Sequence, residues 1–149
     1  MAIAQAICNS FKKQLLEGDA NFTQTSGDQF KLALYTSSAN LSASATAYTS
    51  SGESTDTGSG DYSAGGKKLA KGGQQTSVAT GVAIVDFADL SFTGVTLTAR
   101  GALIYNTSSA VTNAAVAVLD FGGNKTATAG TFTIQFPAFT TSAAILRIS

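Results

Sequence analysis

The chain has 149 residues but no histidine, no tryptophan, one cysteine, one proline and only nine carboxylates. Without histidine it lacks the most common general base, which excludes a Ser-His catalytic pair. The single Cys8 excludes an internal disulfide framework. No apolar run approaches the roughly 18 residues of a membrane-spanning helix, and we expect neither a cleaved signal peptide nor a membrane anchor. These absences favour a structural protein over an enzyme.

Charge is scarce in this sequence. Charged residues make up 12% of the chain and the formal net charge is zero, while hydrophobic residues reach 44%. Such a chain can build a core, and it repels its own copies only weakly, which favours association. Lys67, Lys68 and Lys71 form its one basic cluster. We therefore expect no nucleic-acid partner and no cofactor.

The first segment has the apolar period of a helix. Ile3, Ile7, Phe11 and Leu15 recur at spacings of four, which predicts one apolar stripe within residues 1–18. Gly18 is a suitable left-handed stop. Cys8 falls beside this stripe, so we interpret it as a buried small side chain rather than a reactive thiol.

Alternating apolar residues predict about eight short strands after this helix. We interpret residues 1–149 as a single all-β domain, an antiparallel β-sandwich of jelly-roll-like or immunoglobulin-like type. We predict a bulge at Gly101, a turn at 122–124 and a strand end at Pro137. The predicted strands include residues 30–35, 82–87, 90–93, 95–106, 114–121, 131–136 and 144–148.

Residues 40–66 form a long polar segment, here called the arm. It consists almost entirely of Ser, Thr, Ala, Gly and Asp, with Leu41, Tyr48 and Tyr62 as the larger side chains. Such a composition cannot bury enough apolar area to order itself. We expect an extended arm that is ordered by contact with the body of the protein or with another subunit.

The sequence contains partial matches to catalytic, phosphate-binding and metal-binding motifs, but none is complete. Gly66-Lys67 lacks the preceding glycine and the following Ser or Thr of a phosphate-binding loop, so a solvated turn is the better interpretation. Asp86 and Asp89 could act as an acid and base pair or bind calcium, but two aspartates bracketing a turn between strands explain them better. Asp56 and Asp61 are interpreted as solvated. We predict no catalytic, cofactor-binding or metal site.

Two further groups of residues favour packing over binding. Arg100 and Arg147 lie within predicted strands, and Asp120 is a candidate partner in the same chain or across a subunit interface. The four tyrosines could form a sugar-binding surface, although packing is the stronger hypothesis without tryptophan. They are Tyr35, Tyr48, Tyr62 and Tyr105.

Four blocks of the sequence resemble small virion proteins of tailed bacteriophages. They are MAIAQAICNSFKKQLLEG at 1–18, FKLALYTSS at 30–38, ARGALIYN at 99–106 and VLDFG at 118–122. The resemblance implies a virion component that assembles in the host cytoplasm, and it brings no catalytic motif with it.

The resemblance leaves the place in the particle open. The first hypothesis is a capsid decoration or cement protein, a homo-oligomer (for example a trimer) that binds the major capsid protein and stabilises the shell. The alternative is a tail, fibre or adaptor protein, with carbohydrate binding as one variant. On either hypothesis, we expect deletion of residues 2–17 or of the arm to weaken assembly while the β core still folds. The predicted core comprises Phe30, Leu32, Val85, Ile104, Val118, Phe132, Ile134 and Leu146.

Overall fold

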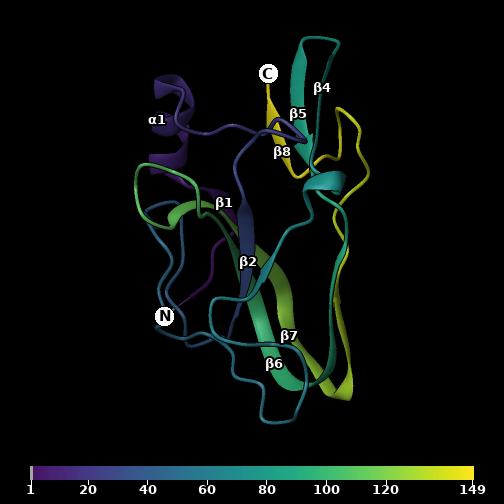
Figure 1. The fold of residues 1–149 in the computed structure, drawn as a ribbon. Coiled ribbons are helices and arrows are strands. Elements are labelled where there is room, and N and C mark those ends of the chain that lie inside the picture. Colours follow the sequence, from purple (N-terminus) through teal and green to yellow (C-terminus); the bar gives the residue numbers. More distant parts are fainter. Residues whose placement is uncertain (1) are drawn as a thin grey trace.

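β-Strands dominate the computed structural model, which describes residues 2–149 (Figure 1). Strands account for 44% of the residues and helical turns for 8%, which confirms a mostly β protein. Two antiparallel sheets have the strand orders β1-β7-β6-β2-β3 and β4-β5-β8. The elements are β1 (Ala6–Ile7), α1 (Asn9–Glu17), β2 (Phe30–Tyr35), β3 (Lys67–Lys68), the short 3-10 helix η1 (Lys71–Gly73), β4 (Gln75–Ala79), β5 (Val82–Asp86), β6 (Leu90–Asn106), β7 (Ala114–Ile134) and β8 (Leu146–Ile148).

A long hairpin of β6 and β7 forms the frame of the molecule. Its pairing runs from Asn106 opposite Ala114 to Leu90 opposite Ile134, so strands that the sequence predicts as separate are continuous. The hairpin bends back on itself at its lower end in Figure 1. Gly94 and Ala129 have positive φ angles of 66° and 46° in this region, and the register shifts there. The bend lets one hairpin contribute to two parts of the core.

The bulge at Gly101 is confirmed, but the predicted turn at 122–124 is wrong. Gly101 pairs with Asp120, whereas Ala99 pairs with Lys125, so β7 carries extra residues between these two positions. Gly122 has a φ of 79° inside this bulge. The glycines therefore widen β7 locally, and the strand continues because β6 supplies partners on both sides of the bulge.

The N-terminal helix is shorter than predicted. α1 begins at Asn9, and Gly18 ends it with a left-handed φ of 74°, as expected. The residues before it are not helical, because Ala6 and Ile7 pair with β7 and Ile3 forms a bridge with Leu41. Pairing with the sheet replaces the helical hydrogen bonds that the apolar spacing favoured.

The predicted core residues pack together, and all but the partly buried Val85 are buried. β2 is covered on both of its faces, although its alternating sequence is that of a strand with one buried face. Phe30 stacks on Phe22 with ring centroids 4.5 Å apart on one side. Burial of each large apolar side chain contributes about 1.5–3 kcal/mol.

The arm folds onto its own chain. Glu53 forms a bridge with Tyr35, and Ala47 forms one with Ala114, so the arm follows the five-stranded sheet without joining it as a regular strand. Tyr48 stacks on Tyr105 of β6 at 5.0 Å. The arm is thus ordered by contact with the body, one of the two expected sources of order. In residues 2–149 no helix is long and apolar enough to cross a membrane.

Candidate functional site

The four tyrosines form hydrogen bonds around Glu53 in the arm, and two of them donate to its carboxylate. Tyr48 donates a hydrogen bond to Oε2 at 2.6 Å, and Tyr62 donates one to Oε1 at 2.7 Å. The Gly65 amide also donates to Oε1 at 2.7 Å. Tyr105 donates to the Gly65 carbonyl, and Tyr35 donates to a carbonyl of the arm. The cluster contains both arm tyrosines and both sheet tyrosines, so it fastens the arm to the sheet.

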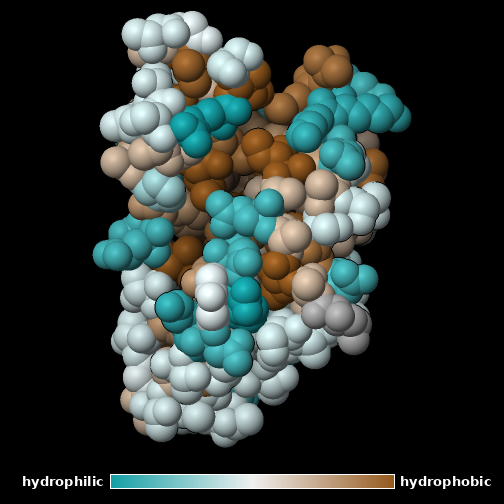
Figure 2. Space-filling model, turned by 180° about the vertical axis from the view of Figure 1, so that it is seen from behind, coloured by the Kyte–Doolittle hydropathy of each residue, from teal (hydrophilic) through white to brown (hydrophobic). Residues whose placement is uncertain are grey.

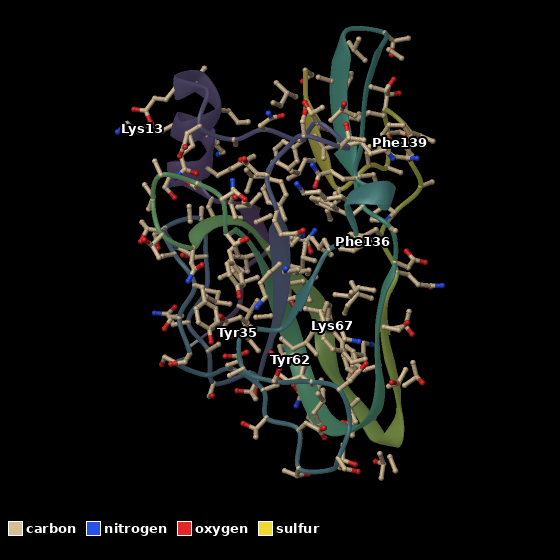
Figure 3. All side chains as sticks on the ribbon, in the orientation of Figure 1. Lys13, Tyr35, Tyr62, Lys67, Phe136 and Phe139 are labelled. Carbon is tan, nitrogen blue, oxygen red and sulfur yellow. The ribbon has the colours of Figure 1, made fainter. Side chains whose placement is uncertain are left out.

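Burial and the nearby carboxylate stabilise the neutral tyrosines. Desolvation, followed by the hydrogen bond to Glu53, raises the pKa of Tyr48 to about 12. The same two causes raise the pKa of Tyr62 further, and desolvation with the charge of Glu53 raises the pKa of Tyr105 to about 12. These hydroxyls therefore remain hydrogen-bond donors at neutral pH. The packing hypothesis is consistent with this arrangement, in which Tyr62 belongs to the arm and Tyr35 to β2 (both are labelled in Figure 3).

The aspartates of the arm are not merely solvated. Asp56 accepts hydrogen bonds from the amides of Gly58, Gly60 and Thr96, and these bonds lower its pKa. Asp61 forms an ion pair with Lys67 and accepts from the Thr93 amide at 2.7 Å. Both side chains fix the arm to β6. Both carboxylates remain accessible to solvent, as expected, but each also has partners within the chain, which the sequence interpretation did not include.

Asp86 and Asp89 bracket a turn, as predicted. Asp86 accepts a hydrogen bond from the Phe87 amide, and Asp89 accepts one from the Phe136 amide. Asp86 is only 4% exposed, and burial raises its pKa. Residues 2–149 contain no group of three or more metal-ligating side chains.

The glycine-lysine segment forms a tight turn onto β2 rather than a solvated turn. A Cβ at Gly66 would lie 1.8 Å from the Leu32 carbonyl oxygen, and Gly66 has a φ of 72°. Lys67 is held by Asp61 and the Ser91 carbonyl, and its ammonium group lies 5.1 Å from the centre of the Phe92 ring. The charge of Lys67 is therefore engaged by groups of the same chain.

The remaining predicted positions also have structural partners. Arg100 pairs with Asp120 at 2.9 Å within the chain, which is the intrachain one of the two expected arrangements. Arg147 donates to the Ser142 carbonyl at 2.7 Å. Cys8 is fully buried, and desolvation raises the pKa of its thiol to about 11, so the thiol is protonated at neutral pH.

An apolar groove of about 460 Å³ lies between α1 and the three-stranded sheet. Phe11, Leu15 and Leu16 line it from α1, and Val85 and Leu146 line it from β5 and β8. Figure 2 shows apolar side chains around a hollow in the upper half of the molecule. Sequence reasoning did not find this groove, because the pattern of α1 predicts an apolar stripe but not that part of it stays uncovered.

Large apolar side chains at this end of the molecule are open to water. Leu16 is 91% exposed, Val78 in β4 is 71% exposed, and Ile148 in β8 is 58% exposed. Single exposed apolar residues are ordinary, whereas a group of them beside an apolar groove is typical of a contact surface. The groove is the candidate functional site.

A second hollow, the trough, lies between the two halves of the bent β7. It has a volume of about 420 Å³, and threonines, Lys125 and Gln135 line it beside Phe121 and Phe132. The centroids of these two phenylalanine rings are 6.1 Å apart. Its lining is more polar than that of the groove.

Neither a protein-family model, nor a curated protein, nor a solved structure matches this chain.

Proposed function

We propose that this protein is a non-catalytic structural component of a tailed-bacteriophage particle, a capsid decoration protein that binds and stabilises the shell. The proposal includes a homo-oligomer, a location in the virion and a sandwich of jelly-roll-like or immunoglobulin-like type. It rests first on the resemblance of the four sequence blocks. The observation that carries it in the structure is the open apolar groove between α1 and the three-stranded sheet. Covering such a surface with another protein removes apolar area from water, which stabilises a complex.

The use of polar groups supports a role in contact rather than in chemistry. All nine carboxylates accept a hydrogen bond or form an ion pair within the chain. Glu17 pairs with Lys13 on the outer face of α1, and Asp19 and Asp28 bind backbone or side-chain donors of loops. The other six are the carboxylates described above. The chain's acidic groups are therefore engaged in holding the fold.

The test is binding to phage heads that lack this protein. The purified protein should co-sediment with expanded heads from the phage that encodes the chain. The bound protein should also raise the temperature at which the heads rupture. A matched sample of unexpanded heads serves as control. Sedimentation with neither heads nor tails would contradict the proposal.

A tail, fibre or adaptor protein that binds host carbohydrate is the second candidate. The trough favours it, because hydroxyl and amide groups beside aromatic rings are the groups that bind sugars. A glycan array separates the two candidates. Binding of a host glycan that is lost on Thr133→Val, together with association with tails alone, would favour this second function.

A further inference from the structure

The charged residues that line the groove have a single sign. They are Lys12 of α1 and Arg147 of β8, and no carboxylate lines the groove. The ammonium group of Lys12 makes no hydrogen bond or ion pair with residues 2–149, whereas that of Lys13, one position along, pairs with Glu17 and lies outside the groove. Figure 3 shows Lys13 on the outer side of α1. The groove is thus an apolar surface with cations beside it.

A second copy of this chain is a poor binding partner for this groove. Two copies placed groove to groove would bring together four cations, and like charges at an interface cost free energy. Each side-chain carboxylate already has an internal partner, so a second copy has no unpaired side-chain carboxylate to offer the groove. A different molecule with a free carboxylate suits the groove better than a second copy does.

The edge of the three-stranded sheet adds a backbone surface to the groove. β8 pairs with β5 on one side and is the last strand of its sheet within the described chain. It lies on the side of its sheet nearest α1 (Figure 1), and all three of its residues line the groove. An exposed edge offers unpaired amides and carbonyls to an extended segment.

We propose that the groove binds an extended apolar segment of another protein that carries a carboxylate. The segment pairs with β8, places apolar side chains between Leu15 and Leu146, and sets its carboxylate beside Lys12 and Arg147. This inference rests on the proposed function only for the class of partner, another structural protein of the particle.

The test is selection of peptides from a displayed random library on the purified protein. The wild-type protein should enrich peptides that combine apolar residues with Asp or Glu. The variant K12E/R147E should enrich apolar peptides with Lys or Arg, and should bind the acidic peptides at least about tenfold more weakly. The control is K68E, which reverses an exposed cation outside both the groove and the trough and should select as the wild type does.

Backbone amide spectra locate the binding site of the selected peptide. Shifts confined to α1, β5 and β8 would support the inference. It would be overturned by equal selection of the same peptides by wild type and K12E/R147E, or by shifts elsewhere. Self-association of the wild type that the Leu16→Glu change abolishes would assign the groove to a second copy. Dodecanoate binding that excludes the peptide and exceeds its affinity would assign it to a lipid.

The two proposals fail in different ways. If heads bind the protein but the groove variants bind them equally well, the groove inference is wrong and the proposed function stands. If the groove selects acidic apolar peptides but the protein sediments with no part of the particle, the proposed function is wrong and the groove inference stands.

Discussion

At the scale of single residues, the carboxylates of this chain hold loops in place through hydrogen bonds and ion pairs. Asp56 holds three backbone amides and Asp120 holds Arg100 and the Gly122 amide. These contacts favour the charged form, and they lower the pKa of each group. Asp86 is the exception, because burial disfavours its charge and raises its pKa. Carboxylates of one chain thus contribute to stability with opposite dependence on pH.

Asp86→Asn should stabilise the protein at pH 7. The raised pKa means that the folded state favours the protonated carboxyl, so this contribution is complete below the unfolded pKa of about 4 and is lost as the pH rises through the folded value. Asparagine is neutral and keeps an oxygen for the Phe87 amide. The difference in Tm between variant and wild type should be positive at pH 7 and shrink toward zero near pH 4.

Asp56→Asn is the matched control with the opposite sign. Its lowered pKa gives stability that is present above the unfolded pKa and lost as the pH falls through the folded value. The variant should have a lower Tm than the wild type at pH 7, and the difference should shrink in acid. Thermal unfolding followed by circular dichroism measures both. A lower Tm for Asp86→Asn at pH 7 would show that its charge is not disfavoured by the fold.

At the scale of elements, the arm covers buried side chains of β2 and β6. Its composition cannot order it, and the tyrosine cluster around Glu53 supplies the order that composition lacks. Ser54 adds a hydrogen bond to the Thr98 carbonyl at 2.8 Å. The expectation that the β core folds without the arm stays a prediction, and deletion of the arm would expose Tyr35 and Tyr105, which are buried in the intact chain.

Glu53→Ala should destabilise the protein by about 2–4 kcal/mol, because two tyrosine hydroxyls and one amide lose their acceptor. Glu53→Gln should destabilise the protein less than Glu53→Ala does, since its one amide oxygen can still accept part of these three hydrogen bonds. Urea unfolding monitored by tyrosine fluorescence measures both changes. Glu17→Ala, on the exposed face of α1, is the control and should change stability by no more than about 0.5 kcal/mol. Equal effects at the two sites would contradict the role of Glu53.

Local pattern predicted the elements well where the periodicity was uninterrupted. The strand at β2, the bulge at Gly101 and the helix stop at Gly18 follow from residue type alone. Pattern could not show that β6 and β7 each run through glycine-containing stretches, because that continuity depends on a partner strand far along the chain. The same holds for residues 6–7, where pairing with β7 outweighs helical spacing.

The candidate site was much less predictable than the elements. The sequence indicated that Arg100 and Asp120 could pair and that the tyrosines pack, yet it gave no signal for Glu53 as the acceptor for Tyr48 and Tyr62. That role depends on the path of the arm across the sheet. The groove was also missed, because α1 forms one wall, strands far along the chain form the other, and only the fold places them side by side.

At the scale of the whole molecule, a neutral chain with few charges has an uneven distribution of available charge. Its carboxylates are engaged by internal donors, while Lys12, Lys68 and Lys125 are exposed. The apolar groove lies at the same end as the exposed Val78 and Ile148. This combination suits a protein that acts by attachment, and attachment to a phage particle is the central claim of the proposed function.

The copy number of this chain in purified particles tests that claim most directly. Quantitative mass spectrometry, with the major capsid protein as internal standard, gives the number per particle. A decoration protein that covers the shell should be present in on the order of hundreds of copies, whereas a tail component would give on the order of ten. Absence of the chain from particles of the phage that encodes it would contradict the account.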